Sequence, residues 1–229
     1  MISVVIPCLN EEKALPKTLS SLVEQRHLSE VIIVDGGSDD NTFAVAKSYQ
    51  DSLPSLTLIN AARGRGSQMN AGAQMAKAEW LLFLHADTEL PPDGLSVLHQ
   101  AVSNRNIEIG CFRHRFSGQH WSLRLISLLH NWRFRMSGII YGDQAMFVKR
   151  SLFLRLGGFP EQLVEDILFS EKAIQHRCHP RMLAAAVTTD SRKFEQIGVW
   201  RALAQVMCIR RQYRQGQAIH QPEFFRNYR

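Results

Sequence analysis

Short apolar runs alternate with stretches of helical periodicity throughout the first half of the chain. The runs occupy residues 2–6, 31–34, 56–59 and 80–84, and apolar residues recur at helical spacing in segments 11–25, 43–49 and 69–76. Fully apolar strands joined by helices are typical of a parallel sheet that is covered on both faces. We therefore predict an α/β fold with a mostly parallel central sheet and helices on both faces.

Polar or glycine-rich sequence follows each of the four runs, at residues 8–12, 35–38, 61–66 and 85–88. Ligands of such sheets bind at the carboxyl ends of the strands. Asp35 and Asp87 lie at strand ends, and two such carboxylates suit a nucleotide with Mg²⁺ or Mn²⁺. The alternative is helix capping, which is the interpretation we favour for Asp39, Asp40 and Asn41.

The second half of the chain has a different pattern of elements. It predicts a helix that ends near residue 102, an arginine-rich strand at 107–116, an amphipathic helix at 121–136, a strand at 141–148, and helices at 164–176 and 195–213. No linker or repeat divides the sequence. We predict one domain over 1–214, with a nucleotide-binding half at 1–104, an acceptor half at 105–191 and a basic C-terminal helix at 192–214, followed by a polar tail at 215–229.

Charge is distributed unevenly along the chain, which has a formal net charge of +6. Residues 1–104 contain 12 acidic and 7 basic side chains, whereas 105–135 contain six arginines and one glutamate, and 192–229 contain eight basic and two acidic side chains. This asymmetry argues against a nucleic-acid binder. No apolar run approaches the roughly 20 residues of a membrane-spanning helix. Four dispersed cysteines without a Cys-x-x-Cys pair indicate reduced thiols in a cytoplasmic protein.

Two further segments contain candidate chemistry. Residues 63–70 place two glycines and two arginines before a helix, which suits an anion, but the segment lacks both the dinucleotide-binding glycine pattern and the lysine of a P-loop. Glu165 and Asp166 open a predicted helix. They either interact favourably with the positive end of the helix dipole or provide a general base. The residues alone leave both interpretations open.

Taken together, these segments resemble the successive signatures of family 2 glycosyltransferases, which have the GT-A fold. The resemblance runs in order over residues 2–170, through the motifs at 4–12, 32–42, 63–72 and 83–88, and then through 157–160 with Glu165 and Asp166. Within the family, the chain is most similar to the compact group that lacks membrane spans and has no assigned substrate.

The resemblance implies a role for each matching residue. Pro7, Asn10 and Glu11 match the loop that cradles the nucleoside, Asp35 matches the acid that binds the base, and Arg63, Arg65 and Asn70 match the basic motif beside the nucleotide. Asp87 matches the last position of the D-x-D motif, which holds Mg²⁺ or Mn²⁺ on the diphosphate. His85 replaces the first aspartate, so it binds the metal, a phosphate, or only orients the loop. Asp166 matches the catalytic base, and Glu165 is the second candidate for that role.

The implied activity is inverting transfer of one sugar from a nucleotide-sugar, UDP-linked as is usual in the family, to an acceptor hydroxyl. The Q-x-x-R-W motif of processive members is absent. One alternative is a sugar-nucleotide nucleotidyltransferase, although residues 8–12 are acidic and glycine-free where such enzymes have a glycine-rich loop. The other is a non-catalytic, membrane-associated scaffold that retains the fold.

Segments 121–136 and 195–214 combine tryptophan with arginine on amphipathic helices. One interpretation is a helix packed on the core with a solvated basic rim. The other is a surface for anionic lipid at the inner face of the plasma membrane, which would suit a lipid-linked acceptor. A third use, open for Arg113, Arg115 and Arg192, is contact with an anionic acceptor or the diphosphate.

Overall fold

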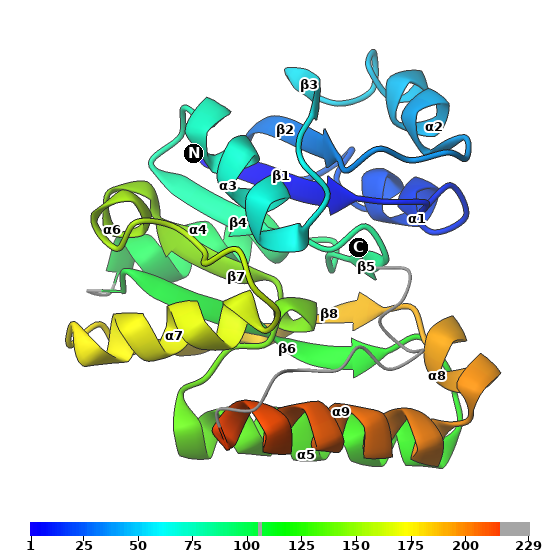
Figure 1. Cartoon of the computed structure of the whole chain (residues 1–229). Helices are drawn as coiled ribbons and strands as arrows, with labels where there is room; N and C mark the ends of the chain where they lie inside the picture. The colour runs from blue at the N-terminus through cyan, green and yellow to red at the C-terminus, as the bar shows by residue number, and fades with distance from the viewer. Residues whose placement is uncertain (105–106, 216–229) are drawn as a thin grey trace.

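The computed structural model describes residues 1–104 and 107–215. In these ranges one eight-stranded sheet has the order β3-β2-β1-β4-β7-β6-β8-β5 (Figure 1). The first four strands are β1 (Ile2–Cys8), β2 (Leu28–Asp35), β3 (Leu56–Asn60) and β4 (Trp80–Phe83). The three pairs that they form are all parallel, which confirms the strands predicted from the apolar runs.

The sheet continues through the second half of the chain with mixed strand directions. β7 (Met146–Lys149) pairs antiparallel with β4 and with β6 (Ile109–Phe116), and β8 (Arg181–Thr189) pairs parallel with β6. The two-residue strand β5 (Thr88–Glu89) pairs antiparallel with the end of β8. β5, which follows the predicted metal-binding loop, therefore forms the edge of the sheet and lies against β8, a strand about a hundred residues later in the chain.

Helices cover both faces of the sheet, as predicted. One buried cluster joins alternate residues of β1, β2 and β4 to α1 (Leu15–Ser20), α2 (Thr42–Ser48) and α4 (Gly94–Asn104). The other joins the opposite residues to α3 (Arg65–Met75), α6 (Arg150–Arg155) and α7 (Glu165–Gln175). Successive side chains along a strand point to opposite faces of the sheet, so alternate residues of the same strand pack into the two different cores.

Some predicted elements differ in extent from the observed ones. The helix expected at 11–25 is reduced to α1, and the strand expected at 141–148 begins with a 3₁₀ turn, η1 (Gly142–Gln144). The helix expected at 195–213 is two helices, α8 (Arg192–Ile197) and α9 (Val199–Arg214). Gly198 separates them with φ of 89°, a conformation outside the right-handed helical region. The tail at 216–229 lies outside the described residues, and the domain boundaries stay a prediction.

Helix α5 (Trp121–Ser137) has two apolar stripes. The inner stripe, Leu123, Ile126 and Phe134, is buried against the rest of the molecule. The outer stripe consists of exposed side chains at Trp121, Leu125, Leu128, Leu129, Trp132 and Met136. α9 lies alongside α5, where the rings of Trp200 and Trp121 are 6.3 Å apart (Figure 1). Across the described ranges, no helix is both long enough and apolar enough to cross a membrane.

Candidate active site

The loops after β1 and β2 are tied together by side chains. The backbone N–H of Asn10 donates to Oγ of Ser38 at 2.9 Å, and Oδ1 of Asn10 accepts from the N–H of Asp39 at 3.0 Å. The backbone N–H of Glu11 donates to Oγ1 of Thr42 at 2.8 Å. These bonds fix the predicted nucleoside loop, in which Asn10 has a left-handed φ of 55°.

Asp35 is buried and organises the turn that follows it. Oδ2 accepts from the N–H groups of Gly37 and Ser38 at 3.0 and 2.9 Å, and Oδ1 accepts from the Ser38 hydroxyl at 2.5 Å. Its predicted contact with the base is not tested by these bonds. Of the three residues expected to cap α2, Asp40 accepts from Thr42, whereas Asn41, at the N-cap, makes no capping bond.

A small cleft joins the carboxyl ends of β1 and β4 to the start of α3. It is lined by Pro7, Cys8, Leu9, Glu11, Arg65, Gln68, His85, Ala86 and Asp87. Gln68, which sequence reasoning missed, donates from Nε2 to the carbonyls of Cys8 and Val34 at 2.7 and 2.8 Å. It thereby fixes the first turn of α3 against two strand ends.

Arg65 connects this cleft to the predicted catalytic pair. Nη2 of Arg65 lies 3.2 Å from Oδ2 of Asp166, and Nε contacts Oε1 of Glu165. Both carboxylates are buried at the first turn of α7. The start of α3 approaches α7 closely because residue 66 is glycine: a methyl group there would lie 2.7 Å from the carbonyl oxygen of Pro160. The structure thus places Arg65 on the carboxylates, a contact that the sequence did not predict.

The environment of Asp166 favours its protonated form. Burial and the neighbouring Glu165 carboxylate raise the pKa of Asp166 to about 7, although Arg65 acts in the opposite direction. A carboxylate with a pKa near neutrality is well suited to accept a proton from a hydroxyl.

Asn70 holds the loop that leads to α7. Its Oδ1 accepts from the N–H of Phe159 at 2.9 Å, and its Nδ2 donates to the carbonyl of the same residue at 2.8 Å. Both polar groups of the amide are engaged, so Asn70 positions the acceptor-side loop. A direct contact with the nucleotide-sugar stays a prediction.

His85 and Asp87 lie at the carboxyl end of β4. Burial and the nearby Arg65 lower the pKa of His85 to about 4, so the imidazole is neutral at pH 7. Asp87 is buried, and its carbonyl accepts from the N–H of Asp190 at 2.9 Å. Within residues 1–104 and 107–215, no group of three or more His, Cys, Asp or Glu side chains is arranged to hold a metal ion.

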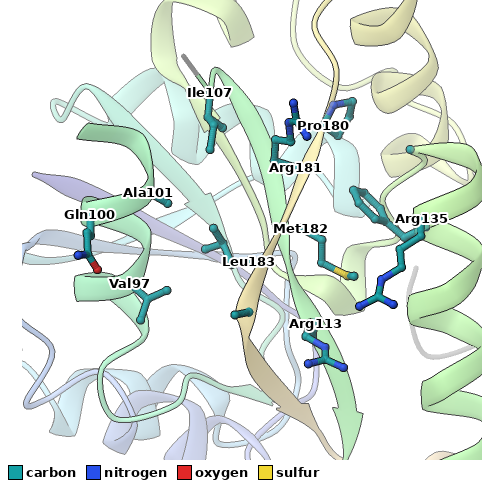
Figure 2. Close-up of a pocket in the computed structure, with 13 residues that line it drawn as sticks. Val97, Gln100, Ala101, Ile107, Arg113, Arg135, Pro180, Arg181, Met182 and Leu183 are labelled. Atoms are coloured by element: carbon teal, nitrogen blue, oxygen red, sulfur yellow. The ribbon is translucent and has the colours of Figure 1, made fainter. Parts of the chain in front are cut away.

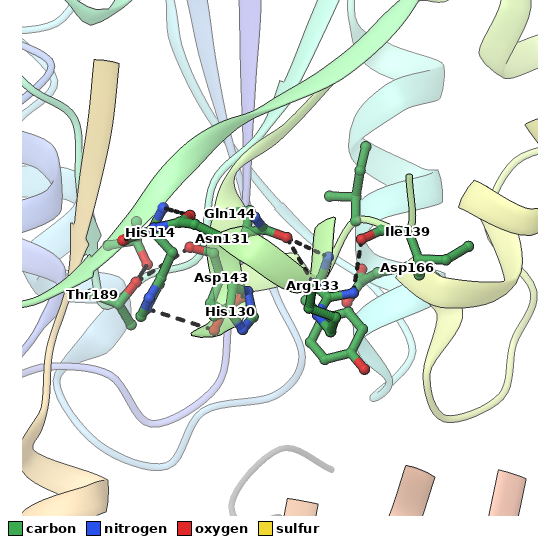
Figure 3. A network of polar contacts seen from close by, with 12 residues as sticks. His114, His130, Asn131, Arg133, Ile139, Asp143, Gln144, Asp166 and Thr189 are labelled. Carbon is green, nitrogen blue, oxygen red and sulfur yellow. Dashed lines mark hydrogen bonds and ion pairs between the residues drawn. The ribbon is translucent and has the colours of Figure 1, made fainter. Parts of the chain in front are cut away.

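A histidine and aspartate cluster beside Asp166, a member of the predicted catalytic pair, was missed by the sequence analysis (Figure 3). Nε2 of His130 lies 3.2 Å from Oδ1 of Asp143, and Nε2 of His114 lies 3.7 Å from Oδ2. His130 is on α5, His114 on β6 and Asp143 on η1. Burial acts to raise the pKa of Asp143, but His130 and His114 hold it well below its usual range. No sequence signal links these three separated residues.

The arginines left open by the sequence have different surroundings. Arg113 lines a cavity of about 800 Å³ together with Arg135 and Arg181, and Figure 2 shows Arg113 and Arg135 on the same side of the β6 and β8 strands. Arg115 donates to Oγ1 of Thr188, and Nε of Arg192 lies 2.6 Å from Oδ2 of Asp190. Arg192 is therefore paired within the protein.

Residues 3–155 match the family model described as glycosyl transferase family 2. The chain belongs to this family. Its structural neighbours are GT-A-like transferases, which confirms the predicted fold class.

The match to each of these curated relatives covers only part of the relative's length. A PGL/p-HBAD biosynthesis glycosyltransferase of Mycobacterium bovis is 29% identical over 175 residues, which are 69% of this chain and 63% of the relative. A dolichyl-phosphate beta-glucosyltransferase of Trichomonas vaginalis is 32% identical over 114 residues, covering 45% of this chain and 35% of the relative. This family 2 chain therefore spans less than two thirds of the relatives that it matches.

Two solved structures share the fold. S. aureus TarS, residues 1–349, has a TM-score of 0.66 and 19% identity, over 90% of this chain and 65% of TarS, and a second TarS structure contains UDP. The mannosyltransferase PcManGT from Pyrobaculum calidifontis, in complex with GDP-Man and Mn²⁺, has a TM-score of 0.67 and 21% identity, over 98% of this chain and 66% of PcManGT.

Proposed function

We propose that this family 2 protein transfers one sugar from a nucleotide-sugar to an acceptor hydroxyl, with inversion and without processivity. The observation that supports this most directly is the pair of buried carboxylates, Glu165 and Asp166, held by Arg65 at the edge of the cleft that contains Asp87. Neighbours that share the fold contain UDP, UDP-GlcNAc or GDP-Man. A UDP-linked donor is our first expectation.

The proposed reaction is a single displacement. The acceptor oxygen forms a bond to the anomeric carbon while the bond from that carbon to the diphosphate breaks, and Asp166 takes the proton of the acceptor hydroxyl. Arg65 keeps Glu165 and Asp166 in place. Arg63, which is exposed on the loop before α3, is the arginine we assign to the charge of the departing diphosphate.

The residues at the end of β4 fit a divalent cation that is brought with the donor. Asp87 offers a buried carboxylate, and Nε2 of His85 is buried without a hydrogen-bond partner in the described part of the chain. One or two protein ligands suffice for Mg²⁺, which takes its other ligands from phosphates and water. Bound there, such a cation would neutralise charge on the diphosphate. We assign Asp87 as the protein ligand for Mg²⁺ or Mn²⁺.

The proposal is tested by donor binding and by the Asp166→Asn variant. We expect UDP- or GDP-sugars to raise the melting temperature of the protein, and the variant to bind them while sugar transfer falls by roughly 10²–10⁴-fold, the usual contribution of a general base. If no nucleotide-sugar shifts the melting temperature, the scaffold alternative is favoured. Transfer that survives in the variant would show that Asp166 is not the base.

We also propose that the outer stripe of α5 contacts an anionic membrane. Its apolar side chains are flanked by the exposed Arg124 and Arg135, and Arg201 and Arg211 are exposed on α9. Neither helix contains an acidic residue. Exposed tryptophan, aliphatic and arginine side chains on one surface are the combination that binds the interface of anionic bilayers. A lipid-linked acceptor hydroxyl would reach the enzyme at this surface.

A further inference from the structure

The turn η1 is built against the catalytic centre. A methyl group at Gly142 would lie 2.4 Å from Nε2 of His85 and 2.7 Å from Oδ2 of Asp166, so only glycine allows the turn to come this close. The N–H of Gly142 also hydrogen-bonds to Asp166. The next residue, Asp143, therefore projects from a turn that touches both the proposed base and the histidine of the metal-binding loop.

The same turn is connected to the donor side of the site. The hydroxyl of Thr189 donates to the carbonyl of Asp143 at 3.4 Å and lies 3.1 Å from the hydroxyl of Thr88, the neighbour of Asp87. The turn that carries Asp143 thus contacts Asp166, the proposed base, and is linked through Thr189 and Thr88 to the segment that contains Asp87, the proposed metal ligand. In a displacement reaction, the sugar that is being transferred lies between the diphosphate and the acceptor oxygen.

Polar atoms of the cluster around Asp143 lack hydrogen bonds of good geometry. Within the described ranges, Oδ1 of Asp143 and Nε2 of His130 are buried and face each other at 3.2 Å, and both ring nitrogens of His114 are buried without a hydrogen-bond partner. His114 is 2% exposed, whereas 30% of the Asp143 side chain is accessible. Asp143 is therefore the most accessible member of the cluster, and a hydroxyl-rich ligand that reaches it would gain hydrogen bonds to a charged group, which are stronger than those between neutral groups.

We propose that Asp143, supported by His130 and His114, binds hydroxyl groups of the donor sugar and determines which sugar is accepted. The inference rests on the proposed function, since it requires a nucleotide-sugar in the cleft. Asp143 would accept hydrogen bonds from the sugar hydroxyls as a carboxylate. The two imidazoles hold the carboxylate in place.

The test compares nucleotide-sugars with the corresponding nucleotides in an Asp143→Asn variant. The probes are UDP-GlcNAc and GDP-mannose, with UDP and GDP as sugar-free counterparts, measured by calorimetry on the whole chain. We expect the variant to bind UDP or GDP within about twofold of the original protein. It should lose about tenfold or more of its affinity for the sugar nucleotide, because a hydrogen bond to a charged group is removed. Asp51→Asn, at an exposed position, is the control.

A second variant and a kinetic measurement separate this role from a structural one. His130→Gln should show the same selective loss for the sugar-bearing ligand, and the donor KM should rise more than kcat falls. Equal losses for nucleotide and nucleotide-sugar would overturn the proposal. So would unchanged donor affinity with a raised acceptor KM, which would place Asp143 in the acceptor site. Failure of the original protein to bind any nucleotide-sugar would instead reject the proposed function itself.

Discussion

At the scale of single residues, Asp166 combines its proposed catalytic role with a cost in stability. Its pKa is raised to about 7 in the folded protein, against 3.8 for an ordinary aspartate. The folded state therefore binds more protons than the unfolded state between these values, and the free energy of unfolding falls as the pH rises from about 4 to about 7. Function and stability make opposite demands on this side chain.

The Asp166→Asn variant tests this effect apart from catalysis. Asparagine does not titrate, so the melting temperature of the variant relative to the original protein should increase between pH 5 and pH 8, with a free-energy change on the order of a few kcal/mol. Thermal unfolding in the presence of a chelator measures it. A difference that is constant with pH, like that expected for the exposed Asp51→Asn variant, would contradict the raised pKa.

Gly142 offers a second test at this scale. In Gly142→Ala, the new methyl group must displace the ends of the His85 and Asp166 side chains, which are movable without unfolding the sheet. We expect transfer activity to fall by roughly 10²-fold, as for other displacements of about 1 Å in a catalytic group, with little change in melting temperature. Gly94→Ala, where the nearest atom would be 3.2 Å away, is the matched control and should retain activity.

Individual residues differed in how far the sequence could predict them. Asp87 and Asp166 could be proposed as site residues from the sequence because each belongs to a contiguous motif, and the structure places them just after β4 and at the start of α7. The ion pair from Arg65 to Asp166 joins residues 101 positions apart, and Asp143 meets histidines from two other elements. Contacts of this kind depend on how elements pack, which motif spacing in one sequence does not report.

At the scale of elements, α3 packs closely against the sheet because it has a glycine, Gly72, at the point of contact. A methyl group at Gly72 would be 2.4 Å from Cγ1 of Val5 and 3.0 Å from Cγ2 of Val34, both on buried strands. Gly72→Ala should therefore lower the free energy of unfolding by about 1–3 kcal/mol, through overpacking. Denaturant unfolding measures the change. Gln74→Ala, on the exposed side of the same helix, should stay within about 0.5 kcal/mol.

Strongly patterned elements were predicted and weakly patterned ones were missed. The first four strands are runs of β-branched, leucine and aromatic residues followed by turn residues, which is a clear signal. β8 contains three consecutive alanines, a poor strand former, and its pairing with β6 is what makes it a strand. α6 has only six residues, too few for a helical period to be recognised. The break at Gly198 follows from its backbone conformation, which helical spacing does not show.

At the scale of the whole molecule, the uneven charge of the sequence separates into two regions. The acidic first half contains the loops at the carboxyl ends of β1, β2 and β4, where the cleft lies. In the second half, arginines surround the cavity shown in Figure 2 and flank the outer stripe of α5. The inner side of α5 contributes His130 and Arg133 to the cluster beside Asp166. One helix therefore joins the proposed membrane surface to the proposed sugar-binding cluster.

The membrane proposal predicts binding that depends on both charge and apolar contact. The protein should sediment with vesicles rich in phosphatidylglycerol at low salt, and less with vesicles of phosphatidylcholine alone or at high salt. Replacing Leu128 and Trp132 together by serine should weaken binding several-fold without lowering the melting temperature, because both side chains are mostly exposed. A double serine variant at the exposed Val23 and Phe43, on the first half of the chain, is the control. Undiminished binding by the α5 variant would rule out this surface.

The pairing of β5 with β8 affects when the site forms during protein synthesis. The loop that contains Asp87 is held by Asp190 and by strand residues 188–189, about a hundred positions later in the chain. A nascent chain on the ribosome cannot complete this loop until residue 190 has left the exit tunnel. Asp166 will by then already have emerged, so the proposed donor site is completed only after the proposed base has left the ribosome.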